Sequence, residues 1–117
     1  MRQGFPKSHR LLKRQDFLEV YSTGTPYRNA GFHLFLKKRE DTRPARLGIT
    51  VRKTVGGAVV RNRLRRWTRD TFRLNQENLA TGADVVVNLH PSLAAKSRTE
   101  FDQLLQDIFR KARLLRQ

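Results

Sequence analysis

Guanidinium groups are the most evident chemical feature of this sequence, because arginine recurs through residues 53–74 at a spacing that suits one helix. On a helical wheel Val60, Leu64, Trp67, Thr71 and Leu74 fall in one arc, which predicts a face directed to the core. The opposite arc is almost purely cationic, whereas an ordinary solvated helix face mixes charges of both signs. Guanidinium groups pair with phosphate in a bidentate geometry. The helix is therefore predicted to bind a polyanion through Arg61, Asn62, Arg65, Arg66, Arg69 and Arg73, with Arg63 and Phe72 at the borders of the two faces.

A pair of glycines, Gly56 and Gly57, precedes this helix and follows Lys53. Free backbone amides at a helix N-terminus attract anions, so a nucleic-acid phosphate held by Lys53 and the helix start is one interpretation. The segment is not a P-loop, because no Gly-Lys-Ser/Thr follows the glycines. A plain tight turn is the alternative.

Aromatic side chains form a second group. Phe17 and Tyr21 lie four residues apart on a predicted helix, and Phe35 lies on the strand face opposite Leu34 and Leu36. If the helix crosses that face, the three rings line a groove flanked by Arg10, Lys13, Lys37 and Arg52. Single-stranded nucleic acid stacks on such rings at about 1–3 kcal/mol per base. The alternative, rings that fill a minor core beneath the helix, stays open.

Side chains that could catalyse a reaction do not form a recognisable pattern. His9, His33 and His90 lack the short spacing of a metal site on one element and are interpreted as single surface or edge histidines. No carboxylate cluster suited to Mg²⁺ and no pairing of a nucleophile with a base is visible. The sequence thus predicts neither a protein active site nor a protein metal site.

Composition narrows the class of partner. The 117 residues include 25 Lys and Arg against 10 Asp and Glu, a formal net charge of +15, and no cysteine. This balance favours nucleic acid as partner and excludes disulfides and thiolate metal sites. No apolar run is long enough for a signal peptide or a membrane span. We expect one cytoplasmic domain over residues 1–117, and composition alone leaves open whether its polyanion is RNA, DNA or an anionic membrane surface.

The helices and strands that position these side chains are predicted from the spacing of apolar residues and from the residues that end each element. We expect a basic extended arm over 1–13 pinned by Leu11 and Leu12, a helix over 14–23 stopped by Gly24, and a short strand near 27–29. Strands over 32–38 and 46–52 should pair as an antiparallel hairpin. The basic helix should end near Asn78, and an apolar strand over 83–89 should be covered on both faces.

The last element is a helix that begins at a capping box formed by Ser97 and Glu100. Its predicted core stripe consists of Phe101, Leu104, Leu105, Ile108, Ala112 and Leu115. Together the elements predict an α+β two-layer sandwich with about four strands in the order α-β-β-β-α-β-α.

The pattern Lys53, Gly56, Ala58-Val59, Arg61-Asn62-Arg63 and Arg65-Arg66 resembles the signature of the protein subunit of bacterial ribonuclease P, and the resemblance spans essentially the whole chain. It implies a fold of the ribosomal S5 domain 2-like type with a left-handed β-α-β crossover, against the usual right-handed rule. In that family a catalytic RNA uses Mg²⁺ to remove the 5′ leader of precursor tRNA, and the protein completes the holoenzyme without cutting. The resemblance thus implies a single RNA-binding domain without membrane contact, and the free protein is expected to be monomeric.

By this resemblance two sets of residues would contact RNA. Phe17, Tyr21 and Phe35, with the flanking cations, would hold the leader strand. Trp67 stands where an aliphatic residue is more usual, and Phe35 lacks the hydroxyl of a tyrosine often found there. The residues that would face the catalytic RNA are Lys53, Arg61, Asn62, Arg63, Arg65, Arg66, Arg69 and Arg73.

Two other classes of protein share some of these features. A ribosomal or other structural RNA-binding protein would have the same charge, size and basic helix, without a role in processing. A basic nuclease that acts alone would cleave RNA without an RNA subunit, which the missing catalytic pattern disfavours.

Overall fold

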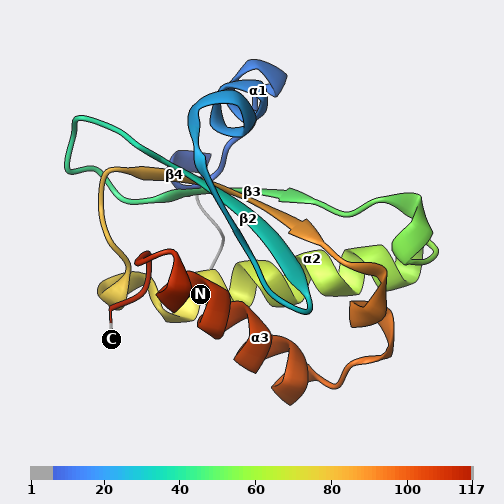
Figure 1. The fold of residues 1–117 in the computed structure, drawn as a ribbon. Helices are drawn as coiled ribbons and strands as arrows, with labels where there is room; N and C mark the ends of the chain where they lie inside the picture. The colour runs from blue at the N-terminus through green and yellow to red at the C-terminus, as the bar shows by residue number, and fades with distance from the viewer. Residues whose placement is uncertain (1–6, 117) are drawn as a thin grey trace.

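The computed structural model describes residues 7–116, and the predicted arm over 1–13 therefore lies partly outside the described residues. The helices and strands follow the predicted order α-β-β-β-α-β-α (Figure 1). They are α1 (Arg14–Thr23), β1 (Thr25–Arg28), β2 (Phe32–Lys38), β3 (Arg46–Thr50), α2 (Ala58–Leu74), β4 (Ala83–Leu89) and α3 (Arg98–Lys111). Short 3₁₀ turns occupy Lys7–His9, Lys53–Val55, Gln76–Asn78 and Pro91–Ala95.

The four strands form one sheet in the order β1-β2-β4-β3. The predicted hairpin between β2 and β3 is wrong, because β4 lies between them, antiparallel to β2 and parallel to β3. The reason is the burial of β4, whose residues from Ala83 to Val87 are all buried. A strand that is apolar on both faces is best covered in the middle of the sheet, whereas a β2–β3 hairpin would have left it at an edge.

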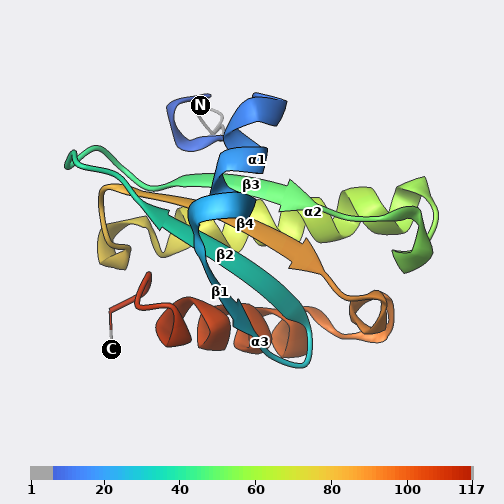
Figure 2. The same ribbon diagram turned by 45° about the horizontal axis from the view of Figure 1, so that its top comes forward.

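The parallel strands β3 and β4 are connected by α2, which packs behind the sheet when the strands are viewed from the side of α1 (Figure 2). In this view both strands run in the same direction and β4 lies below β3, so the crossover is left-handed. The fold class expected from the sequence is thus confirmed, including its exception to the rule of right-handed connections.

Two helices cover one face of the sheet and one short helix covers part of the other (Figures 1 and 2). The main core lies between the sheet and α2 and α3, where Leu64, Phe72, Phe101 and Phe109 are fully buried. None of the helices within residues 7–116 is long and apolar enough to cross a membrane.

The core side of α2 differs in part from the helical-wheel prediction. Leu64 and Thr71 are buried as expected, but Leu74 is 69% exposed and Phe72, assigned to a border, is fully buried. The helix also ends at Leu74 rather than near Asn78, because the side chain of Asn75 donates a hydrogen bond to the carbonyl oxygen of Thr71 and closes the last turn. Thr71 and Phe72 of the final turn are buried, so the buried arc of α2 is centred nearer Thr68 and leaves Leu74 on the outer side.

The structure also differs from the prediction in smaller ways near Leu11 and at the end of α3. Leu11 is buried and its amide donates to the carbonyl of Leu47 on β3, which secures the arm, whereas Leu12 is exposed. At the other end the capping box of Ser97 and Glu100 begins α3 as predicted. The helix stops at Lys111, so the buried Ala112 and Leu115 follow it instead of belonging to it.

Candidate nucleic-acid interface

The outward side of α2 carries guanidinium groups that the protein leaves largely unneutralised. Arg66 and Arg69 are exposed and have no hydrogen bond or ion pair with any residue in the range 7–116. Arg73 lies 3.8 Å from a carboxylate oxygen of Asp70, a separation that counts for little at an exposed site. The cationic face predicted from the sequence is therefore present on the surface, and among residues 7–116 Arg73 is the one arginine of α2 that forms an ion pair.

Two arginines near the start of α2 form hydrogen bonds within the protein. Arg61 donates from Nε to the carbonyl oxygen of Gly56 at 3.0 Å, and Arg65 donates from Nη1 to Asn62 Oδ1 at 3.2 Å. Both guanidinium groups keep further N–H groups for a ligand. Lys53 is exposed in the 3₁₀ turn just before the glycines. The loop thus combines a cation with an uncapped helix N-terminus.

Arg63 has a different environment from the other arginines of α2. Its Nη2 donates to the carbonyl oxygen of Ala94 at 3.2 Å, and its guanidinium carbon lies 5.2 Å from the ring centroid of Trp67. Its Nε is buried and has no hydrogen-bond partner among residues 7–116. Arg98 approaches the same ring at 5.6 Å, and Phe101 meets it edge-on. Trp67 is therefore half-buried between two cations, and Arg63 links α2 to the turn over 91–95.

Three arginines converge beside α1. Arg10, Arg65 and Arg69 line a cavity of about 220 Å³ together with Phe17 and Gly48. Burial, and after it the charges of Arg10 and Arg65, lower the pKa of Arg69. The Nε of Arg10 is buried and makes no hydrogen bond within the described part of the chain. An anion bound here would relieve the repulsion and use these donors.

The face of the sheet toward α1 is organised in rows that run across all four strands. The strand registers place Arg28, His33, Asn88 and Thr50 in one polar row, and Pro26, Phe35, Val86 and Gly48 in the next, apolar row. Helix α1 covers the apolar row, since Phe17 lies over Gly48 and the ring of Tyr21 meets that of Phe35 edge-on at 5.0 Å. The polar row beyond the helix stays open.

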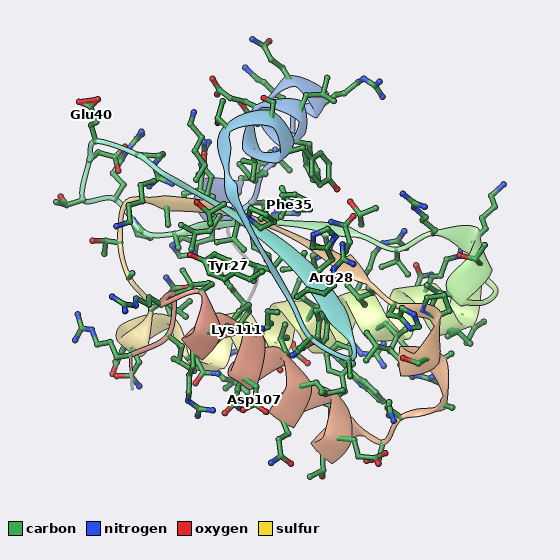
Figure 3. The ribbon with its side chains drawn as sticks, in the orientation of Figure 1. Tyr27, Arg28, Phe35, Glu40, Asp107 and Lys111 are labelled. Atoms are coloured by element: carbon green, nitrogen blue, oxygen red, sulfur yellow. The ribbon has the colours of Figure 1, made fainter. Side chains whose placement is uncertain are left out.

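This open row is the floor of a groove of about 720 Å³, a volume typical of ligand sites. Figure 3 shows Phe35 next to α1, and Arg28 on the side of Phe35 away from that helix. Two cations and several rings line the groove, and none of its lining residues is a carboxylate. The lining consists of Tyr21, Arg28, Asn29, Phe32, His33, Phe35, Thr50, Arg52, Thr54, Asn88, Leu89, His90 and Pro91.

The predicted groove residues fall into two groups. Tyr21, Phe35 and Arg52 line the groove, whereas Phe17 and Arg10 belong to the smaller arginine-lined cavity. Lys37 forms an ion pair with Glu19 at 2.9 Å, and Lys13 is exposed at the N-terminal boundary of α1. Phe17, Tyr21 and Phe35 pack against the small core of Leu11, Val20 and Val86, as the minor-core alternative expects. Tyr21 and Phe35 also line the groove, whereas Phe17 does not.

Sequence reasoning missed most of the polar floor. His33 was interpreted as a single surface or edge histidine, and its position beside Asn88 and Thr50 depends on the register of β4 between β2 and β3. A signal was present in β4, where Asp84, Val86 and Asn88 alternate along one face. Arg28 and His90 also line the groove and gave no pattern of their own.

Residues that could bind a metal ion or catalyse hydrolysis do not gather in the described part of the chain. No group of three or more His, Cys, Asp or Glu side chains suited to a metal is found among residues 7–116. The buried carboxylate of Asp84 accepts hydrogen bonds from Arg39 and Arg46 at the end of the sheet away from the groove. The acidic groups near the core thus serve the fold.

The fold and these two surfaces define a basic α+β protein that binds nucleic acid, with a cationic helix face beside a groove of rings and cations. Comparison with known proteins is consistent with this class. The family model for ribonuclease P matches residues 5–113. The ribonuclease P protein component of Desulfosudis oleivorans is 38% identical over 108 residues, which cover 92% of this chain and 88% of the relative. That of Dictyoglomus turgidum is 35% identical over 115 residues, covering 96% and 95%.

Solved structures agree with the sequence relatives. The RNase P protein of Thermotoga maritima superposes with a TM-score of 0.76 at 33% identity, covering 86% of this chain and 96% of that one. A mutant of the Staphylococcus aureus RNase P protein superposes with a TM-score of 0.89 at 25% identity, covering 93% and 92%. The chain belongs to the ribonuclease P protein family, the protein subunits of an endoribonuclease that processes the 5′ end of tRNA. Its partner is accordingly an RNA.

Proposed function

We propose that residues 1–117 act as a single RNA-binding domain that holds the catalytic ribonuclease P RNA on the α2 face and the 5′ leader of precursor tRNA in the groove. The observation that carries this proposal is the pair of adjacent surfaces, one with unneutralised guanidinium groups and one with rings and cations. Structured RNA presents a dense array of phosphates, which suits the rigid helix face. A single strand exposes bases for stacking, which suits the groove.

The division of labour follows from the side chains. Phosphates of the catalytic RNA would contact Lys53, Arg61, Arg65, Arg66 and Arg69, with Asn62 and Arg73 beside them. Arg63 would contribute less directly, because it is held against Trp67 and Ala94. In the groove Tyr21, Phe35 and Arg52 would hold the leader, which mature tRNA lacks. Precursor would then bind more tightly than product.

The protein would not perform the cleavage itself. Mg²⁺ would supply the hydrolytic chemistry while bound mainly by the RNA, since no group of carboxylates in residues 7–116 suits the ion. The cationic face would reduce repulsion between the catalytic RNA and its substrate, so that less Mg²⁺ is needed. The free protein would be a cytoplasmic monomer.

Reconstitution tests this function. The purified protein is added to a bacterial ribonuclease P RNA at a low Mg²⁺ concentration, and 5′ processing of a precursor tRNA is measured. The protein should stimulate cleavage strongly, and without RNA it should cleave nothing. Stimulation should disappear at high Mg²⁺, where the RNA alone is active. Processing that is unchanged by the protein at low Mg²⁺ would refute the assignment, as would cleavage by the protein alone.

A further inference from the structure

Hydrogen-bonding groups in the polar row of the groove are mostly occupied within the protein. The hydroxyl of Tyr21 donates to Asn88 Oδ1 at 2.9 Å, so its 3.1 Å contact with Thr50 Oγ1 must have the threonine as donor. Asn88 Nδ2 donates to the backbone carbonyl of His33 at 3.2 Å. Tyr21 and Thr50 therefore have no hydroxyl hydrogen left for a ligand, and they form a fixed wall.

His33 is the exception within this row. Its ring lies beside that of Phe35, with centroids 4.4 Å apart and planes inclined by 42°. Its Nδ1 faces Nη2 of Arg28 at 3.5 Å, a long contact in which only the guanidinium can donate. Nδ1 is therefore an acceptor and the ring proton lies on Nε2. No residue among 7–116 accepts a hydrogen bond from that Nε2.

The charge state of His33 agrees with this tautomer. Burial, and then the charge of Arg28, lower the pKa of His33 below its ordinary value, so the ring is neutral at pH 7. A neutral imidazole adds little to phosphate binding, which Arg28 and Arg52 can provide at the same groove. What it offers instead is one flat face and one directed N–H donor.

We propose that His33 reads the base of one leader nucleotide, stacking against it beside Phe35 and donating from Nε2 to an acceptor on the base edge. This inference rests on the function proposed above and adds a residue that sets base preference. A donor at a fixed position favours the bases that place a keto oxygen or an unprotonated ring nitrogen opposite it and disfavours those that place an amino group there. The internal bonds of Tyr21 and Asn88 hold the neighbouring wall rigid, which makes the discrimination possible.

Two substitutions distinguish the contribution of the His33 ring from that of its Nε2–H donor. His33→Phe keeps a flat aromatic face and removes Nε2–H, whereas His33→Gln keeps an amide donor near the same position and removes the ring. Lys38→Gln at the end of the same strand is the control, because Lys38 is exposed and lies outside the groove. Each variant is reconstituted with ribonuclease P RNA, and kcat/KM is measured for precursors that carry each of the four bases at successive leader positions.

The reconstituted wild type should discriminate between bases at one leader position by roughly 3- to 10-fold, the range expected for a net hydrogen bond. His33→Phe should reduce this ratio to below about 2-fold, His33→Gln should keep it while weakening all four substrates, and Lys38→Gln should leave it unchanged. Thermal unfolding of each variant verifies that the comparison is made between folded proteins. An unchanged ratio in a folded His33→Phe variant overturns the proposal, as does a wild type without base preference at any position.

These outcomes are distinguishable from failure of the proposed function. If the protein does not stimulate processing at low Mg²⁺, the function itself is wrong and so is the role of His33. If stimulation and preference for precursor over mature tRNA are intact but His33→Phe behaves as wild type, only the role of His33 is refuted.

Discussion

The ring of Phe17 lies directly over Gly48, so closely that a Cβ atom at Gly48 would come within 2.6 Å of the ring's Cζ. This contact joins α1 to β3 and lets the helix rest on the apolar row of the sheet. Because α1 is seated over that row, the polar row beside it remains open as the groove. The absence of a side chain at Gly48 thus determines where the groove begins.

Substitution of Gly48 by Ala should therefore displace Phe17 and with it α1. We expect a loss of about 1–3 kcal/mol in the free energy of unfolding, the usual cost of overpacking, measured by urea denaturation. Gly57→Ala is the matched control, since a Cβ at Gly57 meets no atom within 4 Å, and it should cost less than about 1 kcal/mol. Equal effects of the two substitutions would show that Phe17 does not depend on the space above Gly48.

The cationic face of α2 predicts a specific salt dependence. Replacement of Arg65 and Arg69 by Ala should weaken binding to ribonuclease P RNA and reduce the slope of log affinity against log salt by roughly one unit per lost phosphate contact. The fold should survive, because neither side chain belongs to the core. Filter binding at several salt concentrations measures the slope.

A control for this experiment lies on another helix. Arg110 of α3 forms an exposed ion pair with Asp107, on the other side of the sheet from the groove (Figure 3). Its replacement by Ala should leave both affinity and slope nearly unchanged. A slope that stays constant in the Arg65/Arg69 variant would contradict the assignment of the α2 face to RNA.

The same arginines predict that small anions stabilise the free protein. Arg10, Arg65 and Arg69 line one cavity. Partial burial there, and then repulsion from Arg10 and Arg65, lower the pKa of Arg69. Millimolar sulfate should raise the melting temperature by mass action, and more than chloride at equal ionic strength. Arg69→Ala should reduce this difference between the two salts. An equal response to both salts would indicate general screening instead of a site.

Phe35 and Phe17 should have separable roles, although the sequence placed both in the groove. Phe35→Ala removes a stacking surface and should weaken binding of precursor tRNA by about 5- to 100-fold, corresponding to 1–3 kcal/mol per base, with little effect on mature tRNA. Phe17→Leu, outside the groove, should change both affinities by the same small factor. Equal losses for precursor and mature tRNA in Phe35→Ala would reject the leader groove.

The sequence was sufficient for the parts of the fold that depend on local patterns. The limits of α1 and β4 and the capping box at Ser97 were predicted correctly, because Gly24, the apolar run of β4 and the Ser-to-Glu spacing act within a few residues. The cationic side of α2 was likewise evident, since helical periodicity alone separates it from Leu64.

What the sequence did not determine is how distant strands pair. The insertion of β4 between β2 and β3 depends on burying β4 on both faces, a property of the whole sheet. The composition of the groove floor could not be predicted for the same reason, because His33, Asn88 and Thr50 become neighbours only through that strand order. Leu74 was misplaced because the buried arc of α2 is centred nearer Thr68 and Phe72 than the apolar spacing alone suggests.

A last prediction concerns the ion-pair network that fixes this strand order at the end of the sheet away from the groove. The buried carboxylate of Asp84 on β4 accepts hydrogen bonds from Arg46 on β3 and from Arg39, which follows β2. Arg39 also donates to the carbonyl oxygens of Arg43 and Pro44. The network therefore ties the loop over 39–45 across the end of β4.

Replacement of Asp84 by Asn would remove one of the two carboxylates that neutralise the nearly buried Arg39, which would keep only Asp41 and backbone carbonyl oxygens as acceptors. We expect a loss of about 3 kcal/mol in the free energy of unfolding, the lower end of the range for breaking a buried pair, because Arg46 is partly exposed and can be hydrated. Asp107→Asn removes an exposed pair on α3 and should cost less than about 1 kcal/mol. Urea denaturation at pH 7 compares the two.

The pH dependence gives an independent readout of the same carboxylate. Burial alone would raise the pKa of Asp84, but hydrogen bonds from Arg46 and Arg39 outweigh it and lower the pKa below its ordinary value. The ionised group therefore contributes its full stability above about pH 4, the ordinary value for aspartate, and this contribution is lost as the pH falls through the lower value of the folded state. The stability of Asp84→Asn should fall less steeply than that of the wild type below pH 4. Parallel curves would mean that Asp84 is not held ionised by the two arginines.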